Sequence, residues 1–484
     1  MIESRVAGAD ELHSLLLEGV ARARRLGKPV LVSRTEPVAV VDPIAAFNVA
    51  RSLATDRSFW KGRDGLYLLA AGSAARMPAA SPRYVALTWQ EILEGAVHDG
   101  SEILGTGPLL LGGFPFDEAS VPSPLWSRLL AASLSLPTWL LTSSNQGAWL
   151  TVNALIAETT DIETLARRLS RGAARLAQPG PAIFASNGEG RYVVDEASGE
   201  WLNLVERAKE TISRGRAEKI VLARSIQVEV RDPDPARALA RLRDRYPGCT
   251  LFAIARGRLC FLGASPERLV RLSDGVVQVS ALAGTAPRGV TIEEDRQFGA
   301  ELLCNAKDRE EHAVVVRMVR EALANCCRDL AVPPTPTLMK LRNVQHLYTP
   351  IAGWLLSDEG LLGLVDRLHP TPAVAGFPRA AAMQFLRDHE QLDRGLYAGP
   401  VGWVDRNGEG EFAVALRSAL LQANEATLYA GCGIMVDSDG GREYEESCLK
   451  LQPMLSALNG AVASAYSEGE MPLGTFPANA NGSR

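Results

Sequence analysis

The run RLVRLSDGVVQVSALA, residues 268–283, decides the fold class that the sequence predicts. Two stretches of Val, Leu and other strand-forming residues flank a short Ser-Asp-Gly turn, and such a turn joins antiparallel strands. The run DRNGEGE, residues 405–411, places a similar turn between two further apolar stretches. Because these hairpins alternate with long helical patterns, we predict an α+β fold and not a doubly wound parallel sheet.

Further strands and helices are expected on both sides of this hairpin. The other expected strands are residues 28–36, 65–73, 108–116, 137–153, 219–230, 250–265, 398–405, 410–422 and 426–436. The expected helices are residues 42–54, 88–97, 198–215, 293–327 and 377–390. We assign residues 1–195 to the framework of sheets and helices, 196–460 to the catalytic region and 466–484 to a frayed tail, with a Pro- and Gly-rich connector at 173–194.

Composition excludes several classes of function. Hydrophobic residues make up 46% and charged residues 22% of the 484, which is typical of a globular protein. The net charge of -5 argues against a nucleic-acid surface, and no run of about 18 apolar residues offers a membrane span. The N-terminus lacks the apolar core of a signal peptide, and the seven cysteines form no C-x-x-C pair. We therefore expect a cytoplasmic protein with reduced thiols and a small-molecule substrate.

Several ionisable residues lie in apolar surroundings. Lys219 opens a strand-like run in which an ammonium loses hydration, and Glu267 follows a strand and a Ser-Pro turn. Asp308 and Glu311 lie three apart on one predicted helix. Each also has an ordinary interpretation: Lys219 as a residue that protects a sheet edge, Glu267 as a turn residue, and the acidic pair as a solvated helix face.

A further cluster lies in GCGIMVDSDGGREYEESCLKLQP, residues 431–453. In a helix, Glu443, Glu446 and Lys450 fall at positions i, i+3 and i+7 and therefore share one face. Taken alone, this spacing is typical of a solvated face with a Glu–Lys pair. The isolated His346 and His369 are likewise more typical of structural histidines than of ligands.

The chemistry of these residues is nevertheless complementary. Two pairs of carboxylates on two helices form an oxygen-rich site that suits Mg²⁺, a hard cation that keeps several water ligands. A desolvated lysine and a glutamate without a metal can act as base and acid on opposite faces of a substrate. Such a site suits a polyanionic substrate whose carboxylate reaches the metal.

Nine motifs follow one another along the second half of the chain. They are EKIVLARS (218–225), GASPERL (263–269), LAGTAPRG (282–289), KDREEH (307–312), RNVQHL (342–347), LHPTPAVAG (368–376), LYAGPVGW (396–403), ALRSAL (415–420) and GCGIMVDSDGGREYEESCLKL (431–451). Their order resembles that of the chorismate-utilising enzymes, and most closely the isochorismate synthases. The resemblance runs over residues 200–455, and the N-terminal runs LGGFPFD (111–117) and GAWLTVN (147–153) are similar to the family less specifically. It implies one α+β unit in which two antiparallel sheets stack with helices outside.

The resemblance implies roles for the acidic residues and for Lys219. Lys219 matches a general base that activates water, and Glu267 matches a general acid that protonates the departing hydroxyl. Glu311 and Glu446 match direct Mg²⁺ ligands. Asp308 and Glu443 lie at positions that contact the ion through water.

The resemblance also implies how the substrate is held. Tyr397 and Arg417 match residues that bind the enolpyruvyl carboxylate, and Lys450 matches a lysine beside the metal-bound carboxylate. The rest of the pocket wall is matched by Thr285, His346, Gly431 and Gly433.

The implied reaction is an isomerisation in which water attacks C2 of chorismate while the C4 hydroxyl leaves. Relatives that make aminodeoxychorismate carry a lysine where this chain has Ala283, and relatives that use ammonia lack a lysine at Lys219. Water is therefore the expected nucleophile, and no amidotransferase subunit is expected. The alternative is a salicylate synthase, in which the same site also eliminates pyruvate.

The chain departs from the family pattern at three places: Ala281 replaces a proline, Cys432 an alanine, and Gly440-Gly441 a Pro-Glu pair. All leave the ionisable positions intact, so we expect changes in loop geometry more than in chemistry. We also expect a monomer that serves menaquinone biosynthesis, with a catechol siderophore as the alternative use of the product.

Overall fold

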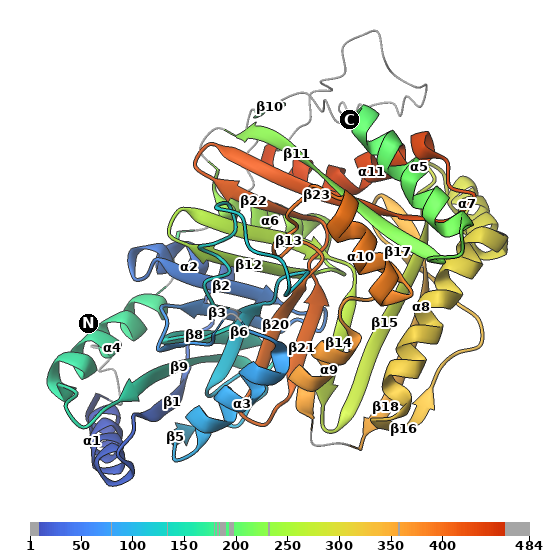
Figure 1. The fold of residues 1–484 in the computed structure, drawn as a ribbon. Coiled ribbons are helices and arrows are strands. Elements are labelled where there is room, and N and C mark those ends of the chain that lie inside the picture. Colours follow the sequence, from blue (N-terminus) through green and yellow to red (C-terminus); the bar gives the residue numbers. More distant parts are fainter. Residues whose placement is uncertain are drawn as a thin grey trace.

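The computed structural model describes residues 9–459 except 79, 133, 179, 182, 184–189, 193–197, 231–232 and 357–358. The predicted tail at 466–484 and ten of the 22 residues of the predicted connector at 173–194 lie outside the described residues, and residues 173–176 of that connector are helical. In the described part, two large β-sheets are surrounded by helices, as Figure 1 shows. Each pair of neighbouring strands described is antiparallel except β1 and β5, which are parallel. The predicted α+β class is confirmed.

The two sheets differ in size, with 13 and 10 strands. In sheet order, the first contains β10 (Gly190–Tyr192), β11 (Lys219–Val230), β23 (Glu425–Ile434), β22 (Ser418–Gln422), β13 (Leu259–Ser265), β12 (Thr250–Arg256), β2 (Asp56–Lys61), β3 (Tyr67–Ala71), β8 (Trp139–Ser144), β9 (Gly147–Ile156), β1 (Val30–Val38) and β5 (Val97–Gly100), with β19 (Gly376–Phe377) beside β11. The second contains β16 (Cys327–Ala331), β18 (Val344–Leu355), β15 (Val276–Pro287), β14 (Arg268–Ser273), β21 (Gly410–Val414), β20 (Pro400–Asp405), β6 (Leu109–Gly113), β7 (Leu134–Leu136) and β4 (Ala75–Arg76), with β17 (Thr337–Lys340) beside β18.

The hairpin at residues 268–283 forms as predicted. Ser273 pairs with Val276 across the turn between β14 and β15. Asp274 and Gly275 have φ values of 51° and 75°, and positive φ at both central positions is the geometry that suits the right-handed twist of a hairpin.

The helices pack around the sheets. They are α1 (Ala9–Leu26), α2 (Pro43–Val49), the 3-10 turn η1 (Ala50–Ser52), α3 (Pro82–Leu93), α4 (Ile162–Leu176), α5 (Ser198–Ser213), α6 (Pro235–Arg245), α7 (Ile292–Cys304), α8 (Ala306–Ala324), α9 (Gly360–Leu368), α10 (Arg379–His389) and α11 (Gly440–Asn459). The single helix expected at 293–327 is wrong. Asn305 interrupts it, because its side chain accepts from the Asp308 amide at 3.1 Å and caps a new helix, α8.

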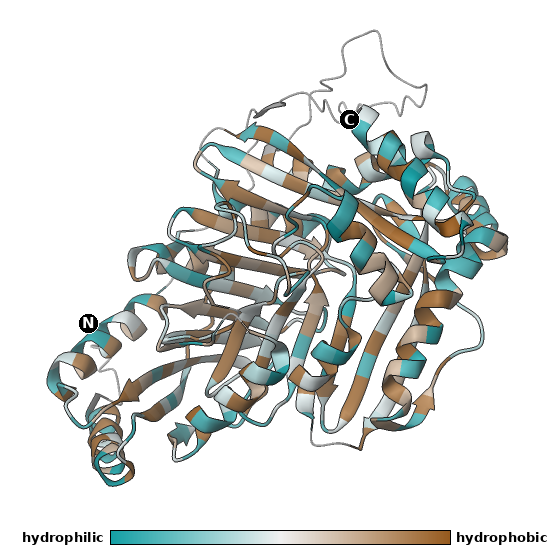
Figure 2. Ribbon diagram, in the orientation of Figure 1, coloured by the Kyte–Doolittle hydropathy of each residue, from teal (hydrophilic) through white to brown (hydrophobic). Residues whose placement is uncertain are grey.

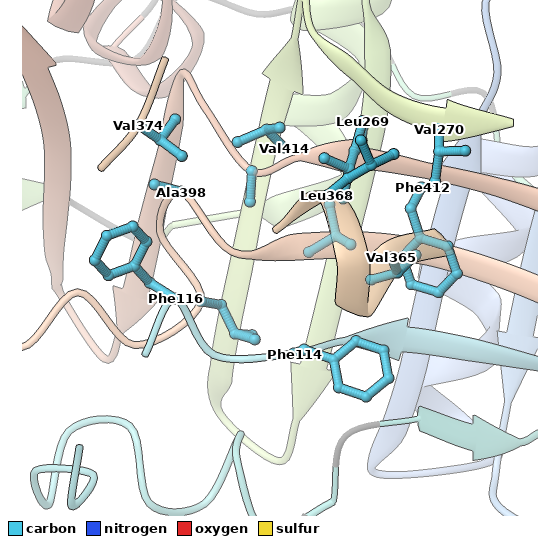
Figure 3. Packing of buried hydrophobic residues seen from close by; sticks show 14 of the residues in the cluster. Phe114, Phe116, Leu269, Val270, Val365, Leu368, Val374, Ala398, Phe412 and Val414 are labelled. Atoms are coloured by element: carbon cyan, nitrogen blue, oxygen red, sulfur yellow. The ribbon is translucent and has the colours of Figure 1, made fainter. Parts of the chain in front are cut away.

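Alternating side chains on the first sheet enter two different cores. In β12, Phe252 packs into the core between the sheets, whereas Leu251 faces the helices on the other side. Figure 2 shows brown apolar residues concentrated along these strands. In the core between the sheets, the rings of Phe114 and Phe412 lie 6.1 Å apart, and Val270 packs in the same cluster (Figure 3). Side chains of a strand point alternately to its two faces. A strand that is apolar on both faces is therefore buried only when a packed layer lies on each side of the sheet.

Both sheets combine strands from the two halves of the chain. In the first sheet β2 pairs with β12, and in the second β6 pairs with β20. No helix in the described ranges is long and apolar enough to cross a membrane.

Candidate active site

A cavity of about 110 Å³ lies where β11 and β23 of the first sheet approach β15 and β18 of the second, beside α8 and α11. All the residues that the sequence assigned to a site line this cavity. They are Lys219, Glu267, Thr285, Asp308, Glu311, His346, Tyr397, Arg417, Gly431, Gly433, Glu443, Glu446 and Lys450. The fold therefore brings together residues that are up to about 230 positions apart, while the role of each stays a prediction.

Lys219 is the first residue of β11, and its side chain is only 1% exposed. Its Nζ donates to Glu311 Oε1 on α8 at 2.7 Å. Because Lys219 also pairs with Phe377 of β19, it does not protect an open sheet edge, so that interpretation is wrong. The lysine is instead a buried cation that faces the cavity.

Glu267 occupies the turn between β13 and β14. Its amide donates to Ser265 Oγ at 3.1 Å, and its carbonyl accepts from the Val414 amide at 3.1 Å. Burial raises the pKa of the Glu267 carboxyl to about 8, although the nearby Lys219 lowers it. The carboxyl therefore holds a proton at neutral pH, as a general acid must.

Four carboxylates form the acidic side of the cavity: Asp308 and Glu311 on α8, and Glu443 and Glu446 on α11. Burial and the charge of Glu311 raise the pKa of Asp308 to about 6. Burial and the charge of Glu446 likewise raise the pKa of Glu443. Repulsion between neighbouring carboxylates therefore contributes to both shifts, and a hard divalent cation bound there would relieve it.

Two lysines partly balance the carboxylates of α11. Lys307 Nζ lies 3.3 Å from Glu443 Oε1, and Lys450 Nζ lies 2.5 Å from Glu446 Oε1. Burial opposes the charge of Glu446, but Lys450 lowers the pKa of that carboxyl below its ordinary value. The interpretation of this helix face as solvated is wrong, because Glu443 is only 5% exposed.

A thiol lies close to the carboxylates without belonging to the cavity wall. Ligand atoms of Cys432, Glu443 and Glu446 lie within 4.8 Å of one another. The Cys432 sulfur is buried and donates to the Glu443 carbonyl at 3.1 Å, and Cys432 does not line the cavity. The metal donors that α8 and α11 contribute to the cavity wall are therefore carboxylate oxygens, which fit Mg²⁺ better than a softer metal.

The opposite wall is suited to an anion. Arg417 is buried at φ 50°, and burial lowers the pKa of its guanidinium below its ordinary value. Tyr397 stacks on Tyr429 with ring centroids 5.2 Å apart, and burial raises its pKa to about 12. At neutral pH this wall offers a buried cation and a phenol that donates a hydrogen bond.

His346 adds a neutral acceptor to this wall. Its Nδ1 lies 3.2 Å from the Gly284 carbonyl and 3.1 Å from Thr285 Oγ1, and burial lowers its pKa to about 3. A carbonyl only accepts, so Nδ1 carries the proton and Nε2 is left as an acceptor. Because Nε2 is buried without a partner in the described chain, a hydroxyl of a bound molecule would satisfy it.

The two predicted glycines leave space for the cavity. A Cβ at Gly433 would lie 2.6 Å from Lys219 Cε and 2.7 Å from Glu311 Oε1, and a Cβ at Gly431 would lie 2.6 Å from the Leu222 carbonyl oxygen. Gly433→Ala is therefore expected to displace the Lys219–Glu311 pair and to reduce kcat by about 10- to 100-fold. Gly248→Ala, where a Cβ has no neighbour within 4 Å, is the control. Equal steady-state rates for the two variants would contradict this packing.

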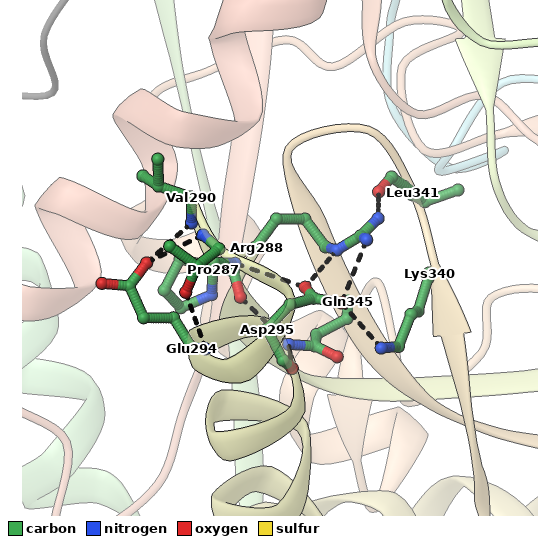
Figure 4. Close-up of polar contacts among 10 residues, drawn as sticks. Pro287, Arg288, Val290, Glu294, Asp295, Lys340, Leu341 and Gln345 are labelled. Carbon is green, nitrogen blue, oxygen red and sulfur yellow. Dashed lines mark hydrogen bonds and ion pairs between the residues drawn. The ribbon is translucent and has the colours of Figure 1, made fainter.

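A cluster of polar contacts fixes the helix that precedes α8 (Figure 4). Asp295, in the first turns of α7, accepts from Lys340 Nζ at 2.7 Å and from Arg288 Nη2 at 3.1 Å. Thr291 and Glu294 form a capping box at the start of the same helix. These contacts join α7 to the ends of β15 and β17 and so place α8, with its two carboxylates, against the cavity.

The structure adds lining residues that the sequence did not assign. Arg394 is buried and paired with Glu390 at 2.6 Å, and it also donates to the Val374 and Val221 carbonyls at 2.8 Å. The i, i+4 spacing of Glu390 and Arg394 at the end of a predicted helix was the available signal. His369 is not among the cavity residues, since its Nε2 contacts the Phe116 carbonyl at 3.1 Å.

The departures from the family pattern spare the cavity. Ala281 pairs with Thr349 within the second sheet, and Cys432 does not line the cavity. Gly440 and Gly441 begin α11, where a Cβ on Gly440 would lie 2.8 Å from Leu202 of α5. The glycine at 440 thus lets α11 approach α5.

Comparison with known proteins gives concordant matches. Residues 18–459 match the family model described as chorismate binding enzyme. The chain is 35% identical over 462 residues to isochorismate synthase MenF of Bacillus subtilis, with 92% of this chain and 97% of the relative covered. It is 37% identical over 466 residues to the salicylate biosynthesis isochorismate synthase of Pseudomonas aeruginosa, with 94% and 97% covered.

Solved structures agree with the sequence matches. The menaquinone-specific isochorismate synthase MenF of Escherichia coli superposes with a TM-score of 0.73 at 27% identity, over 92% of this chain and 99% of that one. Anthranilate synthase component I of Streptococcus pneumoniae, at 22% identity and a TM-score of 0.61, shares the fold. The resemblance drawn from the ordered motifs is confirmed: the chain belongs to the chorismate-binding enzyme family.

Proposed function

We propose that this chain is an isochorismate synthase, which converts chorismate into isochorismate. The observation that carries the proposal is the buried carboxyl of Glu267, whose pKa is raised to about 8, in the same cavity as the buried side chain of Lys219. The two relatives at 35% and 37% identity are both named isochorismate synthases and are matched over nearly their whole length.

The two residues divide the proton transfers between them. Lys219, once its ammonium has released a proton, takes a proton from the attacking water, so that hydroxide adds at C2 as the ring double bonds shift. Glu267 gives its proton to the C4 hydroxyl, which leaves as water, because hydroxide is a poor leaving group. One water enters and one leaves, and proton exchange with solvent restores both residues.

The wall formed by Arg417 and Tyr397 would hold the enolpyruvyl carboxylate. A guanidinium binds a carboxylate through two parallel hydrogen bonds, and the phenol adds a third donor. The ring carboxylate then faces the acidic side of the cavity. There Lys450, whose Nζ also donates to the Gly431 carbonyl at 2.8 Å, lies beside Glu446.

We propose Mg²⁺ as the cofactor, held by Glu311 and Glu446, with Asp308 and Glu443 contacting it through water. Bound there, the ion would neutralise and orient the ring carboxylate. Its support is the repulsion between these carboxylates and the oxygen donors that α8 and α11 contribute to the cavity wall.

Removing either proposed direct ligand should weaken metal binding. Glu311→Ala and Glu446→Ala are expected to raise the Mg²⁺ concentration for half-maximal activity by about 10-fold or more, since each removes a charged oxygen ligand. Isothermal titration with Mg²⁺ gives a readout without turnover, and Glu301→Ala, on the exposed side of α7, is the control. Unchanged metal affinity in both variants would refute the assignment.

The identity of the product tests the proposed function directly. Incubation with chorismate and Mg²⁺, followed by chromatography, should yield isochorismate without equimolar pyruvate. Pyruvate release coupled to lactate dehydrogenase, together with salicylate fluorescence, would instead reveal a salicylate synthase. If neither isochorismate nor salicylate formed, both the isochorismate synthase and the salicylate synthase functions would be contradicted.

We further propose that the enzyme is a cytoplasmic monomer that serves menaquinone biosynthesis. The names of two matched proteins, MenF of Bacillus subtilis and of Escherichia coli, support that pathway. All seven cysteines are free, in keeping with a reducing compartment. Because Ala283 lines the cavity in place of a nucleophilic lysine, we expect no amidotransferase subunit, and size-exclusion chromatography with light scattering tests the monomer.

A further inference from the structure

A hairpin from the N-terminal half of the chain reaches the turn that carries Glu267. This hairpin joins β2 to β3, and its tip spans residues 62–66. At the tip, Arg63 Nη2 donates to the carbonyl of Pro266, the residue immediately before Glu267. Neither the sequence motifs nor the cavity lining had assigned Arg63 a role.

The other polar groups of this turn are held from other directions. The Glu267 amide donates to Ser265 Oγ, and the Glu267 carbonyl accepts from Val414, each at 3.1 Å. Pro266 has no N–H, so its only main-chain polar group is the carbonyl that Arg63 binds. The three contacts together fix the peptide units on both sides of Glu267.

The hairpin is itself anchored by two further contacts. Lys61 Nζ donates to the Pro247 carbonyl at 2.5 Å, and Asp64 Oδ2 accepts from Arg271 Nη1 at 2.9 Å. The first contact is part-buried and the second is exposed. These contacts hold the hairpin in place and so fix the position of Arg63 relative to the turn that carries Glu267.

Arg63 also contributes charge to the surroundings of Glu267. The cations that face this carboxyl are Lys219 from β11, Arg63 from the hairpin, Arg417 from the turn before β22 and Lys450 from α11, in decreasing order of effect on its pKa. Around Arg63 lie Arg268, Cys249, Glu411 and Tyr348. Arg268 is paired with Glu411 at 2.7 Å, so its charge is largely balanced.

We propose that Arg63 is a positioning residue for the reaction, which holds the Pro266–Glu267 turn in place and sets a fixed positive charge beside the general acid. The proposal rests on the proposed role of Glu267. It makes the N-terminal half of the chain a contributor to catalysis through Pro266, without direct contact to the substrate.

Arg63→Met removes the hydrogen bond and the charge while keeping an unbranched side chain. We expect kcat to fall by about 10-fold with KM changed less than about 2-fold. The alkaline limb of kcat should move up by about one pH unit, since losing a cation raises the pKa of a carboxyl. Asp64→Asn, which breaks only the exposed contact of the same hairpin, should change neither.

A second variant and a readout without turnover separate the possible failures. Arg63→Lys, which retains the charge without the planar fork, should lower kcat and keep the alkaline limb. The readout without turnover is the pH dependence of Tm, measured for each chain with Glu267 and with Glu267→Gln, because the difference reports the ionisation of Glu267. In Arg63→Met the pKa of Glu267 found in this way should be higher than in the unchanged chain. This result is expected even if the unchanged chain made no isochorismate and the proposed function failed. The proposal would be overturned if the enzyme were active and Arg63→Met altered neither kcat nor the pH profiles of kcat and Tm. It would also be overturned if Asp64→Asn changed these quantities as much as Arg63→Met does.

Discussion

Glu267→Gln is expected to reduce kcat for isochorismate formation by about 10²- to 10⁴-fold. The amide fills the same space as the carboxyl, but it has no acidic proton to give to the departing hydroxyl. The substrate contacts proposed for Arg417 and Tyr397 remain, so KM should change little. Steady-state rates measured by chromatography of the product at several chorismate concentrations check both values.

The same substitution should improve stability at alkaline pH. The pKa of Glu267 is raised from 4.5 to about 8, so the folded chain holds a proton that the unfolded chain has released. The stability contributed by the protonated group is complete below about pH 4.5 and is lost as the pH rises through about 8. Glutamine stays neutral, so the Tm of Glu267→Gln should exceed that of the unchanged chain increasingly from pH 5 to about pH 9.

Asp405→Asn is the control for the two expected effects of Glu267→Gln, the loss of kcat and the gain of Tm at alkaline pH. Asp405, in β20, is a buried carboxyl whose pKa burial raises to about 6, but it does not line the cavity. Its substitution should leave kcat unchanged. A Glu267→Gln variant that kept near-normal turnover, or one whose Tm followed the same pH curve as the unchanged chain, would exclude Glu267 as the acid.

Lys219→Met is expected to lose activity to a similar extent and, unlike Glu267→Gln, to lose stability. The substitution removes the base and leaves Glu311 without the ammonium that lies 2.7 Å away. Breaking a buried ion pair by removing one partner costs about 3 kcal/mol in unfolding free energy, because the other charge is left uncompensated. Denaturant unfolding in the absence of Mg²⁺ measures this loss.

Combining Lys219→Met with Glu311→Gln separates the two effects. The double variant carries no orphaned charge, so it should recover most of the unfolding free energy and none of the activity. Recovery of turnover in the double variant would show that Lys219 acts only as the partner of Glu311 and not as a base. Additive losses in stability would show that the pair is not coupled.

The sequence predicted several strands of the C-terminal half because their patterns are local, but β16, β17 and β18 were not among the expected strands. The strand expected at residues 219–230 has the bounds of β11, and the alternation in residues 250–265 yields β12 and β13. The strand β2 was not predicted, because its sequence DRSFWK is rich in charged residues. These charges are balanced by residues outside the strand, such as Arg76, whose guanidinium lies 2.6 Å from the Asp56 carboxylate. No local sequence pattern reveals such partners.

The members of the candidate site followed from the order of the motifs, but their mutual contacts did not. Lys219 and Glu311 are far apart in sequence, and their pairing depends on how α8 crosses β15. Gly284 has φ 74°, and a Cβ there would lie 3.2 Å from Asp308 Cβ, so this approach requires a glycine. The contact of Arg63 with Pro266 has a similar origin, since it depends on a pairing between strands from opposite halves of the chain.

Because both sheets combine strands from the two halves of the chain, neither sheet can be completed until late in synthesis on the ribosome. Strand β2 ends at Lys61, whereas its partner β12 begins only at Thr250. At the usual pace of synthesis this interval lasts roughly 10 to 40 s, during which β2 has its hairpin mate β3 but not its second neighbour. The nascent chain therefore carries exposed strand edges that invite association with other chains, and we expect its yield in cells to depend on holding chaperones.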